Sequence, residues 1–293
     1  MTEQVCKFHF TFESSYFVDY PETALACPQS KLETLPELGL LDRNYNDAET
    51  TPAWARFATH VRHLNDAAVT GVTYKVLFVV RHGRGVHNVV MEKEGSVEWK
   101  NHWSKLDGDG SRTWFDADLV DEGVEEAKTL SRLFADGIEN RGFPLPDSIY
   151  TSPLSRCLAT TKLAFKGILE DRGTLFKPKV KELLRERLTD HTCDRRRDKS
   201  WIQSVYPEYE LEAGFAENDV LWHPDRYESD TEHMARTQQL LENIFDSESG
   251  TFLVLVTHSF TLSSILQVIG APMFRVGEGV IVPFLVRSQK LHF

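Results

Sequence analysis

The sequence predicts a three-layer α/β/α sandwich, in which two layers of helices enclose a mostly parallel central sheet. Two apolar runs, 76–80 and 252–256, indicate buried strands, because no polar face alternates through either of them. Segments with helical spacing of apolar residues separate the predicted strands through much of 74–286, an alternation that is typical of parallel α/β sheets. The chain of 293 residues can bury one large core, so we expect a single domain spanning 1–293.

Residues 1–70 are expected to form an N-terminal extension that lies on the main fold. Residues 7–12 alternate polar and aromatic side chains, as a half-buried or edge strand does. Residues 54–64 carry apolar side chains at helical spacing. The extension has too few clustered apolar residues to build a core of its own.

The middle of the chain predicts three further elements after the strand at 74–80. Asp121 suits a helix N-cap, and apolar residues at steps of three and four continue from there to Ile138. Residues 148–152 form the second predicted strand. Pro153 is tolerated in the first turn of the helix that follows, so Arg156 lies near the positive end of a helix dipole.

The last third of the chain is expected to complete the sheet. Residues 180–184 predict a short third strand, and a helix follows from about 230 to 245. The apolar strand at 252–256 leads into a helix over 260–269. A final strand at about 280–286 is expected to close the sheet.

Two long polar segments, 93–117 and 188–228, are predicted to be lid insertions over the end of the sheet. The first has no clear period, and the second is longer than a structureless loop normally is unless the loop has a function. Their aromatic residues are expected to pack the lids, and the tryptophans among them are Trp99, Trp103, Trp114, Trp201 and Trp222.

Composition narrows the classes of partner. The net charge of −11 argues against general binding to nucleic acid or to an anionic membrane surface. No apolar run approaches the roughly 20 residues that span a bilayer, and the N-terminus lacks the apolar core of a signal peptide. Widely spaced cysteines indicate a reducing compartment, so we predict a cytoplasmic protein: these are Cys6, Cys27, Cys157 and Cys193. The sequence carries no signal for oligomeric state.

Charged and polar side chains follow the predicted strands at their carboxyl ends, where open α/β sheets bind ligands. Gly83 and Gly85 allow a tight turn and a close approach of the backbone, and the neighbouring arginines supply cationic forks. These features predict an anion-binding site with a histidine at its centre. The residues in question are Arg81, His82, Arg84, Arg156, Glu186 and His258.

This pattern resembles the histidine phosphatase superfamily, specifically its phosphoglycerate-mutase-like branch. The resemblance covers about residues 74–265 and rests on the order of its motifs as well as on their letters. The motifs are Arg81-His82-Gly83 with Asn88, Ser152-Pro153-Leu154-Ser155-Arg156, Leu184-Arg185-Glu186-Arg187, and Val256-Thr257-His258.

The resemblance implies a set of roles. His82 is the nucleophile that attacks phosphorus, and nearby arginines keep its imidazole neutral and therefore nucleophilic. Glu186 donates a proton to the leaving alkoxide and then accepts one from water. The phosphoryl oxygens are held by Arg81, Asn88, Arg156 and His258, and the last of these also counts as catalytic. No metal or other cofactor is required, because arginines and the second histidine offset the charge.

The sequence departs from the family pattern in three places, namely at two positions in the site and in residues 187–197, which lack the glycine-bearing loop of the family's mutases. Arg84 stands where the family usually has a carboxylate or amide, and Ser259 stands where it usually has glycine. Arg84 could add phosphate affinity, bind a second acidic group of the substrate, or disturb hydrogen bonding around the nucleophile. We predict that Arg84 and Arg187 bind the substrate.

Three side-chain groups have alternative interpretations. Glu186 could instead form a surface ion pair with Arg185 or Arg187. The run 195–197 could contact substrate, although a run of charges is more often a solvated face. His191 and Cys193 suggest a metal, but no second ligand pair has suitable spacing, so we predict no metal site.

The predicted function is a metal-independent phosphatase that acts on a small phosphorylated metabolite through a phosphohistidine. Two alternatives stay open. One is phosphoryl transfer of the phosphoglycerate-mutase type. The other is a pseudo-enzyme that keeps the phosphate pocket for binding, or for other chemistry on an acidic substrate.

Overall fold

The computed structural model describes residues 7–45 and 51–291, and it confirms an α/β fold with a mostly parallel central sheet. Within these residues, strands β3, β7, β4, β5 and β6 run parallel, and β9 is antiparallel to both β3 and β1. Listed from one edge of the sheet to the other, the strands are β1 (Phe8–Phe12), β9 (Ile281–Lys290), β3 (Val72–Arg81), β7 (Phe252–Thr257), β4 (Ser148–Thr151), β5 (Lys179–Val180) and β6 (Glu210–Leu211).

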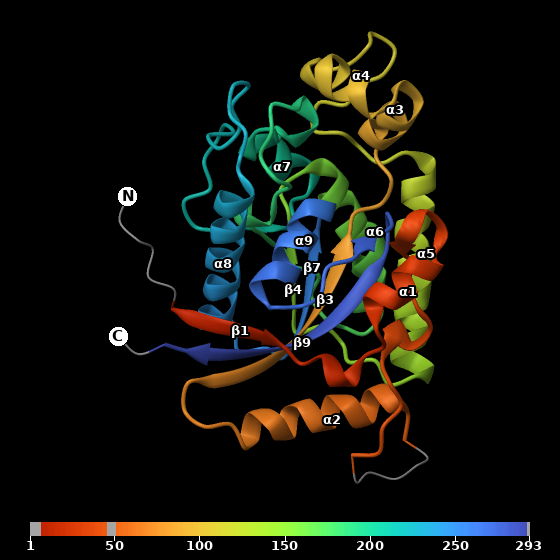
Figure 1. The fold of residues 1–293 in the computed structure, drawn as a ribbon, viewed down its shortest axis with the longest axis vertical. Coiled ribbons are helices and arrows are strands. Elements are labelled where there is room, and N and C mark those ends of the chain that lie inside the picture. Colours follow the sequence, from red (N-terminus) through yellow and green to blue (C-terminus); the bar gives the residue numbers. More distant parts are fainter. Residues whose placement is uncertain (1–6, 46–50, 292–293) are drawn as a thin grey trace.

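Helices cover both faces of this sheet (Figure 1). One face carries α2 (Ala53–Asp66), α5 (Asp121–Asn140) and α6 (Ser155–Glu170), and the other carries α8 (Asp230–Ser247) and α9 (Ser259–Val268). Successive side chains of β3 point to opposite faces of the sheet, so each face packs against its own layer of helices. The ring of Phe78 lies 5.5 Å from the rings of Trp54 in α2 and Phe134 in α5, whereas Lys75 Nζ lies 5.6 Å from the Phe245 ring of α8. Among the described residues, no helix combines the length and apolarity that a membrane span requires.

The N-terminal region contributes to the main sheet. The predicted edge strand is confirmed as β1, which pairs with β9, and the predicted helix is confirmed as α2. A short helix α1 (Tyr20–Ala26) precedes β2 (Lys31–Leu32), which pairs with β8 (Arg275–Val276) in a separate two-stranded sheet. Cys6 lies outside the described residues, so its predicted free state is not addressed by the structure.

Two predicted elements differ from the structure. The third strand is shorter than the predicted 180–184, because β5 ends at Val180 and a 3₁₀ turn follows at Glu182–Leu184. The final strand is longer than predicted and continues to Lys290, paired along most of its length with β3. A ten-residue strand between two partners gains a full ladder of hydrogen bonds, which an apolar run alone does not reveal.

The segment after β3 is helical and was not predicted to be. Two short helices, α3 (Val86–Glu94) and α4 (Ser96–Asn101), project beyond the end of the sheet, at the top of Figure 1. Trp99, Trp103 and Trp114 pack together there in a second apolar cluster, with Val90, Ala117 and Cys193. The predicted packing role of these three tryptophans is therefore confirmed.

The segment 188–228 contains a short helix and one strand. Helix α7 (Lys199–Val205) lies in it, and β6 pairs with β5 at the edge of the main sheet. The run 195–197 is not a solvated face, because Arg196 is fully buried and donates to Glu182 and to the backbone carbonyls of Ala216 and Asn218. These contacts attach the segment to the fold.

Candidate active site

A cavity of about 310 Å³ opens at the carboxyl ends of the parallel strands, and we call it the catalytic cavity. Six predicted site residues line it, namely Arg81, His82, Asn88, Arg156, Glu186 and Arg187. They come from segments up to 106 positions apart, and the sheet brings them together because parallel strands end at one edge. Two other predicted residues, His258 and Arg84, are not among the residues that line this cavity.

His82 follows β3 directly, and its backbone N–H donates to the carbonyl of Thr257 on β7 (3.0 Å). Its side chain is buried, with Nδ1 2.7 Å from the carbonyl oxygen of Gly83. A carbonyl only accepts, so Nδ1 carries the proton and donates it. Nε2 accepts from the Nε of Arg156 at 3.3 Å. Burial and the charges of Arg156 and Arg81 lower the pKa of His82 well below its usual value.

The loop that carries His82 lies tightly against the first turn of α5. A Cβ atom on Gly83 would lie 2.4 Å from the carbonyl oxygen of Gly123, and one on Gly123 would lie 2.1 Å from that of Arg84. Contacts this short are impossible for any other residue type without a shift of the backbone. Two glycines therefore fix the position of the loop that carries His82.

Replacing Gly123 by alanine is expected to destabilise the protein by about 1–3 kcal/mol and to lower kcat, since the loop must move away from α5. Gly167→Ala is the matched control, because a Cβ at this helical position in α6 meets no atom within 4 Å. That change is expected to stabilise by up to about 1 kcal/mol through helix propensity. Urea unfolding measures both variants, and equal stabilities would contradict the close approach.

Arg156 lies in the first turn of α6, as predicted, and is fully buried. Its guanidinium uses all three nitrogens: Nε donates to His82, Nη1 donates to the carbonyl of Cys193 (2.7 Å), and Nη2 donates to Asp194 Oδ1 (3.1 Å). Three contacts in one plane fix the orientation of the fork. Arg156 therefore presents a fixed cation at Nε2 of His82.

His258 follows β7 and is completely buried behind His82. The two rings are 5.0 Å apart between centroids. Its Nε2 lies 2.8 Å from Ser152 Oγ and 3.4 Å from Cys157 Sγ. The predicted role of His258 as a phosphate ligand stays a prediction, because its ring lies beside that of His82 and does not line the catalytic cavity.

Glu186 lines the catalytic cavity, and its carboxylate lies at the N-terminus of α9. Its carboxylate accepts from the backbone N–H groups of Arg187 (3.0 Å), Phe260 (3.1 Å) and Thr261 (3.2 Å), and from Ser259 Oγ (3.4 Å). Desolvation nevertheless raises its pKa, as expected of a proton donor. Glu186 was alternatively expected to form an ion pair with Arg185 or Arg187. Instead, Arg185 pairs with Asp219 (2.5 Å) and Arg187 pairs with Asp230.

The other arginines of the cavity are also paired. Arg81 donates through Nη1 to the carbonyl of Val276 (2.7 Å) and through Nη2 to Glu278 (2.7 Å), and its Nε is buried without a partner among the described residues. Arg187 lies 4.9 Å from the ring centre of Phe260. Both predicted ligands thus reach the cavity with part of their hydrogen-bonding capacity already used.

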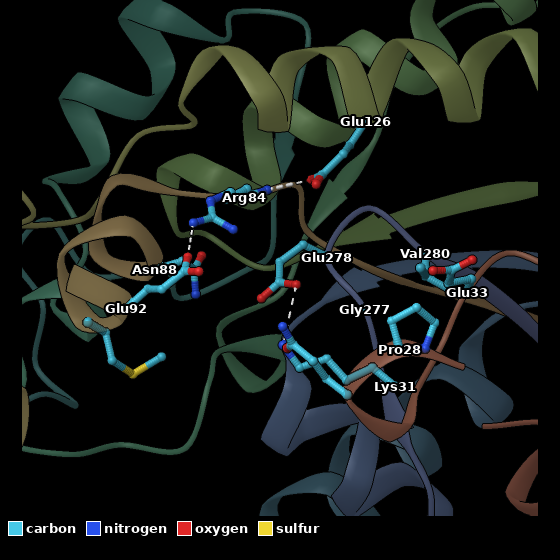
Figure 2. A pocket seen from close by; sticks show the side chains of 12 residues that line it. Pro28, Lys31, Glu33, Arg84, Asn88, Glu92, Glu126, Gly277, Glu278 and Val280 are labelled. Atoms are coloured by element: carbon cyan, nitrogen blue, oxygen red, sulfur yellow. Dashed lines mark hydrogen bonds and ion pairs between the residues drawn. The ribbon is translucent and has the colours of Figure 1, made fainter. Parts of the chain in front are cut away.

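Arg84 points into a different cavity of about 380 Å³, which we call the second cavity (Figure 2). Its guanidinium pairs with Glu92, and its backbone N–H donates to Glu126 (2.7 Å). Asn88 and Met91 line both cavities and form the wall between them. Substrate binding by Arg84 stays a prediction, and it would require a substrate that reaches past this wall.

Asn88 has a structural role that its motif did not reveal. Its Oδ1 accepts from the N–H of Gly85 (2.9 Å) and so caps the first turn of α3. The same turn brings His87 to the catalytic cavity, with its ring 5.7 Å from that of His82. His87 was not predicted as a site residue, because the helix that begins at Val86 and carries His87 was not predicted.

The sequence also missed Asp194, which lines the catalytic cavity beside Arg156. The ligand atoms of His191, Cys193 and Asp194 lie within 4.8 Å of one another, so the cluster could be considered for a metal. Two features disfavour that use. Asp194 Oδ1 already accepts from Arg156, and burial raises the pKa of Cys193 well above its usual value, against a thiolate ligand.

Comparison with known proteins decides the family. A model of the histidine phosphatase superfamily (branch 1) matches residues 77–274, which include every strand-end motif of the catalytic cavity. The chain belongs to the histidine phosphatase superfamily. The predicted resemblance is thereby confirmed, and this superfamily member is an enzyme of the phosphatase or mutase type.

Curated relatives of this histidine phosphatase superfamily member carry mutase names. The chain is 45% identical over 257 residues to a "Probable phosphoglycerate mutase" of Arthroderma benhamiae, covering 86% of this chain and 76% of that protein. It is 31% identical over 232 residues to "Probable phosphoglycerate mutase PMU1" of Saccharomyces cerevisiae, covering 73% and 78%.

Solved structures similar to this superfamily member include a phosphatase and a mutase. A phosphoserine phosphatase from Entamoeba histolytica aligns with a TM-score of 0.41 and 19% identity, over 72% of this chain and 94% of that chain. A phosphoglycerate mutase from Thermus thermophilus aligns with a TM-score of 0.41 and 21% identity, over 74% and 99%.

Buried neutral histidines make the stability of this histidine phosphatase superfamily member depend on pH. Burial, as the largest cause, lowers the pKa of His82 and His258 well below the usual value and that of His233 to about 4. Below about pH 6.5 the unfolded chain takes up protons at these residues, and the folded protein takes them up only at the lowered pKa, which is about 4 for His233. The free energy of unfolding therefore falls on acidification, by about 1.4 kcal/mol per pH unit for each such histidine.

Urea unfolding at several pH values below neutrality measures this dependence. His233→Gln removes one such histidine at a position outside the catalytic cavity, so between about pH 6.5 and pH 4 the slope of the free energy of unfolding against pH is expected to decrease by the contribution of one proton. A free energy of unfolding that stays constant through this range would contradict the buried neutral state.

Proposed function

We propose that the protein is a phosphatase that hydrolyses a small phosphorylated metabolite through a phosphohistidine at His82. The observation that carries the proposal is the tautomer of this histidine. Because Gly83 fixes the proton on Nδ1, the lone pair of Nε2 is directed towards the Arg156 guanidinium at the catalytic cavity. A neutral imidazole with a directed lone pair is a competent nucleophile near pH 7. The cytoplasmic location and the absence of nucleic-acid and membrane partners remain predictions from composition.

The reaction divides into two displacements at phosphorus. In the first, a bond forms between His82 Nε2 and phosphorus, the bond to the substrate oxygen breaks, and the proton of Glu186 passes to the leaving alkoxide. In the second, water attacks the phosphohistidine, the nitrogen–phosphorus bond breaks, and the Glu186 carboxylate takes the proton of the water. Arg156, Arg81 and Asn88 offset the charge on the phosphoryl oxygens in both steps.

A mutase is the second candidate, favoured by the names of the curated relatives. A mutase must hold a substrate that carries a further anionic group while it keeps the phosphoenzyme from water. Such a substrate calls for cationic charge beyond that needed for one phosphoryl group. Here Arg81 is paired with Glu278, Arg156 with Asp194, and Arg187 with Asp230. These carboxylates reduce the cationic surplus of the catalytic cavity, which favours hydrolysis of a singly phosphorylated substrate.

One experiment separates the candidates. The protein is incubated with ³²P-labelled 3-phosphoglycerate, with and without bisphosphoglycerate primer, and with a panel of other alkyl phosphomonoesters. A phosphatase releases inorganic phosphate, and an acid-free quench traps an acid-labile label on the chain. Isomer interconversion without release of phosphate would replace the proposal by a mutase. Binding of inorganic phosphate without any turnover on the panel would replace it by a pseudo-enzyme.

A further inference from the structure

We propose that Asp194 is a positioning residue, which orients the guanidinium of Arg156 and sets the protonation state of Glu186. This inference rests on the proposed function, because it assigns two effects to one carboxylate within the same catalytic cavity. Asp194 matches none of the strand-end motifs. It lies in a 3₁₀ turn (Thr192–Asp194) of the segment 188–228.

The geometry of Asp194 is that of a fixed support. Its side chain is buried, and both carboxylate oxygens have a donor: Oδ1 accepts from Arg156 Nη2 (3.1 Å), and Oδ2 accepts from Thr189 Oγ1 (2.9 Å). The adjacent carbonyl of Cys193 accepts from Arg156 Nη1 (2.7 Å). One short turn therefore holds two of the three guanidinium nitrogens, which leaves Nε directed at His82.

The negative charge of Asp194 balances the guanidinium of Arg156, which a neutral hydrogen-bond acceptor would not do. A guanidinium buried to this extent needs a counter-charge, since an unpaired buried cation is strongly destabilising. A neutral amide at this position would accept one hydrogen bond but leave the positive charge unbalanced. Arg156 would then be held less firmly and would interact more strongly with the carboxylate of Glu186.

Asp194 and Glu186 both line the catalytic cavity, and two like charges in one site favour the protonated form of one of them. After desolvation, the charge of Asp194 is the next cause that raises the pKa of Glu186, while Arg156 and the N–H groups of Arg187 and Phe260 act in the opposite direction. The titratable and charged groups around Glu186 are Arg81, Arg156, Arg187, Arg236, Lys100, Asp194, Tyr227, the thiols Cys157 and Cys193, and the histidines His82, His87 and His191.

Most of these neighbours carry no negative charge. Burial raises the pKa of Cys157 and of Cys193, so both thiols stay protonated, and burial lowers the pKa of His82 and of His87, so both rings stay neutral. Asp194 is the carboxylate of this set. Removing its charge is therefore expected to let Glu186 ionise at lower pH.

The test compares pH profiles of kcat/KM for the wild type and Asp194→Asn with two substrates. An alkyl phosphomonoester requires a proton on its leaving oxygen, whereas p-nitrophenyl phosphate has a leaving group that departs without one. Glu186→Gln shows which limb of the pH profile belongs to Glu186. The alkaline limb, where kcat/KM falls as Glu186 loses its proton, must disappear when this carboxyl group is removed. With the alkyl substrate, Asp194→Asn is expected to move the alkaline limb to lower pH by about half a unit or more. With both substrates, kcat is expected to fall about tenfold or more, because Arg156 is misplaced.

Asp107→Asn is the matched control, because this aspartate pairs with Arg195, and both residues lie outside those that line the catalytic cavity. It is expected to leave both the limb and kcat unchanged. Asp194→Glu keeps the charge, and it is expected to retain the wild-type limb even where kcat falls. This second variant keeps the test decisive if Asp194→Asn does not fold.

An unmoved alkaline limb in a folded Asp194→Asn protein would overturn the inference, and so would a limb displaced equally by Asp194→Glu. A wild type that releases no phosphate from either substrate contradicts the proposed function instead. The two failures are therefore distinguishable.

Discussion

His82→Ala is expected to lower kcat for phosphomonoester hydrolysis by at least about a thousandfold, because no other group takes over attack on phosphorus. The structure supports an effect of this size, since Nε2 of His82 accepts from Arg156 and Nδ1 is held by the Gly83 carbonyl. Steady-state phosphate release measures the loss. The acid-labile phosphoryl label on the chain is expected to disappear together with the activity.

His223→Ala is the control for the loss of a histidine, because this side chain is 64% exposed and does not line the catalytic cavity. It is expected to keep wild-type activity and labelling. Thermal unfolding of both variants shows whether the fold is retained. Wild-type turnover by a folded His82→Ala protein would rule out the phosphohistidine mechanism.

Arg156→Ala is expected to reduce kcat/KM by about a hundredfold to a thousandfold, as removal of one preorganised charge-stabilising donor does. The same change leaves the buried Asp194 carboxylate without its guanidinium partner. Breaking a buried ion pair on one side costs about 3–5 kcal/mol, so the free energy of unfolding is expected to fall by a similar amount. Urea unfolding and steady-state kinetics measure the two effects.

Arg195→Ala is the matched control, because Arg195 pairs with Asp107 at a partly exposed position and does not line the catalytic cavity. Exposed ion pairs contribute little, so its stability is expected to change by less than about 1 kcal/mol. If Arg156→Ala and Arg195→Ala behaved alike in both measurements, the assigned position of Arg156 would be incorrect.

Periodicity predicted the buried and long elements well. The apolar run at 76–80 and the amphipathic segment from Asp121 became β3 and α5, since burial on a sheet or along one helix face imposes a local pattern. The short elements were harder. Strand β5 has two residues and is held by its neighbours in the sheet, and α3 is a nine-residue helix in a segment where no apolar period is visible.

Six of the predicted site residues line one cavity because each lies at the carboxyl end of a strand or within seven residues after it. That placement needs only the order of strands and motifs. His258 and Arg84 show where this reasoning ends. His258 lies behind His82 against Ser152 and Cys157, and Arg84 turns away towards Glu92 and Glu126.

By itself the sequence determined the fold class and the family, because strand periodicity and short motifs are local in the chain. Only the tertiary structure decided which partner holds each charged group. Asp194 reaches Arg156 across 38 positions and Glu278 reaches Arg81 across 197. Such pairs depend on how distant segments pack, and the energy of a buried charge depends on its surroundings rather than on its neighbours in the chain. The structure therefore added the carboxylates that hold the arginines of the site.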